Sequence, residues 1–141
     1  MMMDVRAFRP EDESSVILLW EQCDLLRPWN VPYKDIQRKL LVNPELFLVG
    51  VLDEKLIGTV MAGYEGHRGW LNYLAVNPEY QRQGYATALV REVESLLANA
   101  GCPKINLQIR ASNQAVIDFY HQLGYQVDDA ISMGKRLDRD N

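Results

Sequence analysis

Several features that mark common classes of protein are missing from this sequence of 141 residues. No apolar run is long enough to cross a bilayer, and the first residues lack the apolar segment of a secretion signal. The two cysteines, Cys23 and Cys102, are far apart, form no CxxC motif and have no histidine pair nearby, so a zinc site is not expected. We therefore expect a cytoplasmic protein with reduced thiols, no bound metal and no membrane anchor.

An excess of positive charge is also missing. The formal net charge is −4, with 15 basic and 19 acidic residues. Because nucleic-acid surfaces present a basic face, this balance argues against a nucleic-acid partner, and it permits a cationic amine substrate without requiring one. The hydrophobic content of 48% suffices for one core. No linker, repeat or low-complexity segment divides the chain, so residues 1–141 are predicted to form a single domain.

The motifs of two large nucleotide-binding classes are absent as well. There is no GxxxxGK[ST] and no GxGxxG followed by a ribose-binding acid. What is present is a glycine-bearing stretch, Gln81 to Ala86, between an apolar run that ends at Val76 and a long amphipathic segment. A turn of this kind leaves N–H groups unpaired at a helix N-terminus and suits a diphosphate held by main chain. An ordinary strand-to-helix connection is the alternative interpretation.

Apolar periodicity predicts the order of the other elements. Strands are expected at residues 5–9, 46–52, 56–62, 69–76, 105–109 and 131–137, and helices at residues 12–23, 34–41, 86–100 and 116–123. A meander of strands followed by alternating helices and strands predicts an α+β or α/β sandwich, with a mixed sheet and helices on both faces.

The run from Asn72 to Ala86 resembles the strand, loop and helix start of the GNAT N-acetyltransferase superfamily, whose signature is Q/R-x-x-G-x-G/A. Two later stretches, residues 107–113 and 119–125, resemble the family's later strand and helix, in the family's order and separation. Residues 23–30 and 63–69 look most like the small bacterial YpeA-type acetyltransferases. The resemblance implies a GNAT-like central mixed, mostly antiparallel sheet of six to seven strands, which splays apart to leave a cleft.

The same resemblance implies an activity. Acetyl-CoA would be the cosubstrate, with no metal, and its acetyl group would pass to a primary amine by direct attack in a ternary complex. The acceptor would be a small molecule or a peptide, and a homodimer is compatible with the family. The residues implied to bind the cofactor are Leu74, Ala75, Val76, Arg82, Gln83, Gly84, Tyr85, Ala86, Thr87 and Asn113.

Tyr120 resembles the family's proton donor to the departing thiolate. It lies seven residues after Asn113, which puts both on nearly one helix face. A phenol with a pKa near ~10 stays protonated at neutral pH and can donate. Without the loop motif, the residues favour the alternative interpretations, in which Asn113 is a helix N-cap and Tyr120 is a partly buried core aromatic.

No general base can be assigned from the sequence. Some family members carry glutamate where this chain has Gln108, and an amide does not take a proton at neutral pH. Glu65, His67 or solvent are the other candidates, and a catalytically weak acyl-CoA-binding sensor or regulatory module is therefore the alternative function. The residues predicted to contact the acceptor are Arg27, Trp29, Asn30 and Gln108.

Overall fold

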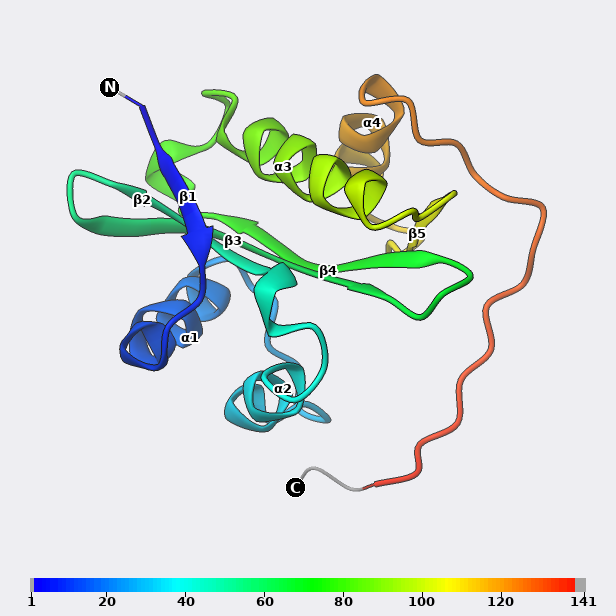
Figure 1. Cartoon of the computed structure of the whole chain (residues 1–141), viewed down its shortest axis with the longest axis horizontal. Coiled ribbons are helices and arrows are strands. Elements are labelled where there is room, and N and C mark those ends of the chain that lie inside the picture. The colour runs from blue at the N-terminus through cyan, green and yellow to red at the C-terminus, as the bar shows by residue number, and fades with distance from the viewer. Residues whose placement is uncertain (1, 139–141) are drawn as a thin grey trace.

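The computed structural model describes residues 2–138 and has a five-stranded sheet at its centre (Figure 1). The strands are β1 (Asp4–Ala7), β2 (Phe47–Leu52), β3 (Lys55–Tyr64), β4 (Gly69–Val76) and β5 (Ile105–Leu107), and they lie side by side in that order. The first four pair antiparallel, and β5 runs parallel to β4. The predicted mixed, mostly antiparallel sheet is confirmed, with five strands among the described residues instead of six or seven.

Two helices cover each face of the sheet (Figure 1). The helices α1 (Glu13–Gln22) and α2 (Pro32–Lys39) lie on one face, and α3 (Tyr85–Asn99) and α4 (Gln114–Gln122) lie on the other. Pro32 stands in the first turn of α2, where its missing N–H would have no partner in any case. Within residues 2–138, no helix combines the length and apolar character needed to span a membrane.

A hydrophobic core fills each side of the sheet. The core under α1 and α2 is built around Trp20, Phe47 and Ile36, all fully buried. The core under α3 and α4 contains the apolar stripe of α3, Leu89, Val90, Val93 and Leu97, and it also contains Tyr120. Because successive strand residues point to opposite faces, each central strand contributes to both cores.

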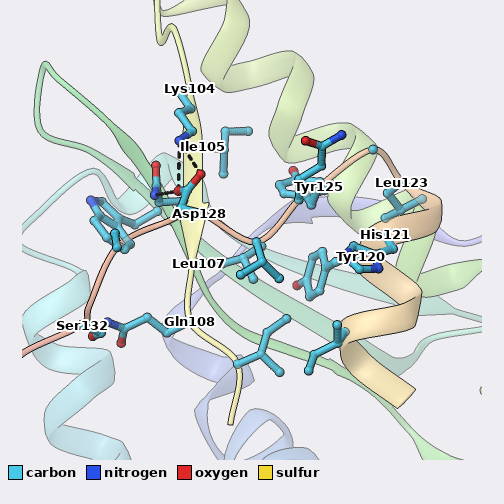
Figure 2. A pocket seen from close by; sticks show the side chains of 18 of the residues that line it. Lys104, Ile105, Leu107, Gln108, Tyr120, His121, Leu123, Tyr125, Asp128 and Ser132 are labelled. Carbon is cyan, nitrogen blue, oxygen red and sulfur yellow. Dashed lines mark hydrogen bonds and ion pairs between the residues drawn. The ribbon is translucent and has the colours of Figure 1, made fainter. Parts of the chain in front are cut away.

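The strand predicted at residues 131–137 is wrong. Residues 126–138 run outside the sheet (Figure 1), and Val127, Ile131, Met133 and Leu137 are 82% to 92% exposed. Alternating apolar residues form a strand only where a neighbouring edge pairs with them. Here the segment meets the body through polar contacts, such as the 2.9 Å ion pair between Lys104 and Asp128 (Figure 2).

The strand β4 separates from β5 after its first three residues. Gly69, Trp70 and Leu71 pair with β5, and that pairing then stops. The register between β3 and β4 shifts at this level, and Tyr73 adopts a left-handed backbone with φ of 51°. A bulge of this kind bends a strand and increases its twist. The rest of β4, as far as Val76, has no strand on its β5 side among residues 2–138.

Candidate active site

A cleft of about 1300 Å³ opens where β4 and β5 separate. Its walls come from the segment between α1 and α2, from α2, from the second half of β4, from the loop and first turn of α3, and from α4. The predicted site residues that line it are Leu74, Val76, Arg82, Gly84, Tyr85, Ala86, Thr87, Asn113, Tyr120, Arg27, Trp29, Asn30 and Gln108. Of the others, Gln83 does not line the cleft, and Ala75 points into the core on the α1 side.

The loop before α3 has an unusual backbone. Arg82 and Gly84 are both left-handed, with φ of 63° and 87°. Gly84 is the N-cap of α3 and offers no side chain to the N–H groups of the first turn, which have no partner inside the helix. A Cβ built on Gly84 would meet no atom within 4 Å, so the loop borders open space. Concave N–H groups and the positive end of a helix together attract anions.

The main-chain carbonyl of Val76 is held by Gln81, which opens the predicted diphosphate loop, and by Cys23, contacts that the sequence does not predict. The Gln81 amide donates to it at 2.9 Å, and the Cys23 thiol donates at 3.3 Å. Burial raises the pKa of Cys23, so its thiol keeps the proton that it donates. Both lone pairs of the carbonyl oxygen are therefore engaged within the chain.

Tyr120 is buried, with 6% of its surface exposed, yet it borders the cleft. Its ring meets Phe119 and Tyr125 edge to face, with centroids 5.0 and 5.3 Å away. Figure 2 shows the ring extending from α4 toward Leu107 on β5. Burial raises the pKa of Tyr120 well above its ordinary value of 10.0, so the phenol stays protonated.

Asn113 caps α4, because its side chain accepts the Val116 N–H at 3.4 Å. The N-cap interpretation of the sequence is therefore confirmed. The same residue lines the cleft, so capping and a contact with a ligand are compatible.

Three of the residues predicted to contact the acceptor, Arg27, Trp29 and Asn30, lie in the segment between α1 and α2, which lines the cleft. Arg27 donates to the main-chain carbonyl of Asp24 at 2.8 Å and so holds its own loop. The Trp29 ring lies under the guanidinium of Arg110, at 5.5 Å. Asn30 donates to the Tyr73 hydroxyl at 3.3 Å. The segment between α1 and α2 is thus tied to both β4 and the loop after β5.

The two side chains that the sequence offers as a base, Glu65 and His67, lie outside this cleft, and Gln108 is engaged elsewhere. Gln108 lines the cleft, but its amide donates to the Ser132 hydroxyl of the C-terminal segment (Figure 2). Glu65 lies in the exposed turn between β3 and β4, where it accepts the N–H groups of His67, at 2.8 Å, and Arg68. Neither Glu65 nor His67 lines the cleft.

Tyr73 is, together with Asp35, a cleft residue that the sequence analysis missed. Its main-chain oxygen accepts a hydrogen bond from the Thr59 hydroxyl at 2.9 Å, and its phenol donates to Asp35 at 2.6 Å. A left-handed conformation costs a residue with a Cβ about 1–2 kcal/mol, and these contacts offset it. Strand alternation predicts Tyr73 as an ordinary strand residue, and no signal in the sequence marks the bulge.

The fold and cleft agree with what comparisons with known proteins find. The model of the Acetyltransferase (GNAT) family matches residues 15–125, and the chain belongs to this family. A protein named Acetyltransferase from Yersinia pestis (strain Pestoides F) is 51% identical over 135 residues, which cover 96% of each chain. Family membership makes the protein an acetyltransferase of the GNAT type.

Two solved structures share the fold at 20% identity. AAC(6')-Iy in complex with the bisubstrate analog CoA-S-monomethyl-acetylneamine has a TM-score of 0.78, with 96% of this chain and 99% of that chain covered. The PaiA N-acetyltransferase from Thermoplasma acidophilum, in complex with coenzyme A, has a TM-score of 0.73, with 93% and 94% covered.

Acetyl-CoA is the acetyl donor that the family uses. The open space beside Gly84, the uncapped start of α3 and the unpaired half of β4 fit its diphosphate and its pantetheine arm. Among residues 2–138, no three His, Cys, Asp or Glu side chains are grouped so that they could hold a metal ion.

Proposed function

We propose that residues 1–141 form one catalytic domain that transfers the acetyl group of acetyl-CoA to a primary amine of a small molecule or a peptide. One observation carries this proposal: the left-handed loop at Gly84 and the buried phenol of Tyr120 border the same cleft, although they belong to different helices. The first suits a diphosphate and the second suits a leaving thiolate, which are two ends of one cosubstrate.

The binding role falls mainly on the main chain. The N–H groups from Arg82 to Thr87 hold the diphosphate, with Gly84 allowing close approach. The free edge of β4 from Leu74 to Val76 holds the pantetheine as an added strand would. A pantetheine amide that bonds to the Val76 carbonyl takes the place of Gln81 or Cys23. Asn113 borders the arm from the start of α4.

Chemistry requires an uncharged amine and a proton for the thiolate. The amine attacks the thioester carbonyl directly, and a main-chain N–H of β4 stabilises the negative charge that develops on the carbonyl oxygen. Tyr120 then gives its phenolic proton to the sulfur, which leaves as a thiol, and the proton that the acylated nitrogen loses restores the phenol by way of solvent. The acceptor enters between Arg27, Trp29 and Asn30, at the α2 end of the cleft. The named complex of AAC(6')-Iy with an analog that joins CoA and an acetylated amine supports such a ternary arrangement.

The test is thiol release by purified protein mixed with acetyl-CoA and a panel of amines, amino acids and peptides. The proposal expects release that requires both acetyl-CoA and an amine. Tight binding of acetyl-CoA without release for any amine would instead identify a sensor or regulatory module. Placement closest to the YpeA-type proteins, a cytoplasmic location and the state of association stay predictions from the sequence.

A further inference from the structure

Two carboxylates line the cleft among residues 2–138, and their surroundings differ. The Asp24 side chain is 94% exposed at the rim, and the Asp35 side chain is 24% exposed. Asp35 lies in the first turn of α2 and faces β4. The cleft therefore holds one enclosed carboxylate, at the end where the acceptor is proposed to enter.

Asp35 is directly bonded to a phenol. The Tyr73 hydroxyl donates to Asp35 Oδ2 at 2.6 Å and accepts from the Asn30 amide at 3.3 Å. The donor and acceptor directions are fixed, because an ionised carboxylate only accepts and an amide N–H only donates. A hydrogen bond to a charged group of this length is among the stronger ones in proteins.

The bulge in β4 decides which side of the sheet this phenol occupies. Tyr73 packs in the core of the α1 face, against Trp20, and the next residue, Leu74, packs in the core of the α3 face. Tyr120 belongs to the α3 face. One phenol thus stands on each side of the gap between β4 and β5, with the proposed thioester path along Leu74 to Val76 between them.

We propose that Asp35 and Tyr73 act as the proton-accepting pair for the acceptor amine, which is an alkylammonium when it binds. This inference rests on the proposed function. The ammonium gives one proton to the Tyr73 oxygen while the Tyr73 hydroxyl proton passes to Asp35. The neutral amine then forms its bond to the acetyl carbon, and the bond between that carbon and sulfur breaks. The thiolate takes the proton of Tyr120, and the second proton, which the acylated nitrogen must lose, restores the Tyr120 phenol by way of solvent. Asp35 later loses its own proton to solvent, which restores the pair.

Other groups of the cleft are less suited to this role. The Gln108 amide takes no proton. The Lys39 amine donates to the main-chain carbonyl of Ala62, and the Cys23 thiol donates to Val76. Asp24 is exposed at the rim. Asp35 is the remaining carboxylate, and its hydrogen bond to Tyr73 lets it take a proton by way of the phenol oxygen on β4.

Charged groups from α2 itself and from the C-terminal segment surround the pair. Arg38, one turn along α2, lies 3.7 Å from Asp35 Oδ1 and also contacts Asp138 of the C-terminal segment at 3.1 Å. Arg136 of the same segment donates to Asn30 at 3.4 Å. From β4, Tyr73 is the titratable group that faces Asp35. Asp35→Asn also removes the negative charge beside Arg38, whereas Tyr73→Phe leaves that ion pair in place, so both variants are compared below.

The experiment compares Asp35→Asn with wild-type protein, using the amine from the panel that gives the fastest thiol release. Asparagine keeps an oxygen that accepts from Tyr73 and cannot take a proton. We expect kcat/KM to fall on the order of 100-fold at neutral pH. The deficit should shrink as the pH approaches the pKa of the free amine, near ~10.4 for a lysine side chain, because solvent then supplies the neutral amine.

Tyr73→Phe provides a second variant that keeps the ring on Trp20 and removes the hydroxyl. It should show the same loss and the same dependence on pH, and the double variant should be no slower than either single one, because the two residues act as a unit. Acetyl-CoA affinity, measured by calorimetry, should be unchanged in all three. Thermal unfolding shows whether each variant is folded.

Asp24→Asn is the matched control, since it removes one negative charge from the same cleft without touching Tyr73. An equal loss in this variant, or a loss in Asp35→Asn that is the same at every pH, would overturn the inference. Unchanged activity of Asp35→Asn beside an active wild type would overturn it and leave the proposed function intact. A wild type that releases thiol with no amine would overturn the proposed function, and this inference with it.

Discussion

The rings of Trp20 and Tyr73 stack with centroids 3.8 Å apart and planes inclined by 13°. Trp20 is fully buried in α1, so the stack ties the bulge of β4 to the core. The Trp20 N–H donates to the Thr59 hydroxyl at 2.9 Å, and that hydroxyl donates to the Tyr73 main chain. The point at which β4 leaves β5, and hence the position of the cleft, is fixed by three residues of three different elements.

Replacing Thr59 by Val should destabilise the fold at this point. Valine has the same shape but leaves the Trp20 N–H without its acceptor, and an unpaired buried group costs about 1–3 kcal/mol. Urea unfolding measures the loss. Thr59→Ser keeps the hydroxyl and loses one methyl group, so the free energy of unfolding should fall by only about 1 kcal/mol. A Val variant at least as stable as the Ser variant would show that the hydroxyl does not hold the bulge.

Replacing Gly84 by Val should weaken acetyl-CoA binding by roughly tenfold or more, as calorimetry would measure. A side chain there projects into the open space in which the diphosphate is proposed to sit. Gly66→Val is the matched control, because Gly66 is also left-handed, with φ of 98°, has equally open surroundings and lies in the turn between β3 and β4. Equal affinities for the two variants would place the diphosphate elsewhere.

Replacing Tyr120 by Phe should lower kcat on the order of 100-fold and leave acetyl-CoA affinity unchanged. Tyr125→Phe is the control, because it removes a neighbouring hydroxyl, which donates to Glu94 at 2.8 Å, and leaves the Tyr120 phenol in place at the cleft. Because burial raises the pKa of Tyr120, its phenol still holds its proton above pH 10.0, and turnover should show no alkaline decline from this group. Unaltered kcat in Tyr120→Phe would remove Tyr120 from the chemistry.

Acid should weaken the fold through Asp12. Arg6 donates to both of its carboxylate oxygens, at 2.7 and 2.9 Å, and this pairing is the main cause that holds the pKa of Asp12 below its ordinary 3.8. A lowered folded-state pKa gives stability that is present above the unfolded value and lost as the pH falls through the folded value.

Asp12→Asn should therefore lower the free energy of unfolding by about 1–3 kcal/mol at neutral pH, and the difference should shrink as the pH falls below 3.8 toward the lower pKa of the folded state. Urea unfolding of wild type and Asp12→Asn at several pH values measures this difference. Asp128→Asn removes an exposed pair with Lys104 and should change the curve little. A difference between wild type and Asp12→Asn that does not depend on pH would contradict the account.

Much of this fold could be predicted from the sequence, because the apolar stripes of α1, α3 and α4 mark their buried faces, and the apolar runs of β2 and β3 mark strands buried on both faces. The strand at residues 131–137 could not be decided in this way, since its apolar side chains alternate but meet no sheet edge here. Strand pairing depends on whether a sheet edge lies beside the segment in the folded chain, and the pattern of the segment itself does not contain that information.

The cleft was predictable only in part, for a similar reason. Gly84, Asn113 and Tyr120 stand in recognisable local motifs, and they line one cleft. Asp35 and Tyr73 are far apart in the chain and belong to no motif, and their contact depends on a bulge that the sequence does not mark. The sequence assigns no general base, because Asp35 and Tyr73, the residues proposed for that role, meet only in the folded chain.

The central claim is acetyl transfer to an amine, and one measurement tests it most directly: the rate of coenzyme A release with and without acceptor amines, for wild type and Tyr120→Phe side by side. The account predicts release that depends on both acetyl-CoA and an amine and is on the order of 100-fold slower in the variant. A wild-type protein that binds acetyl-CoA but releases no thiol above the rate without amine, for any acceptor, would contradict it.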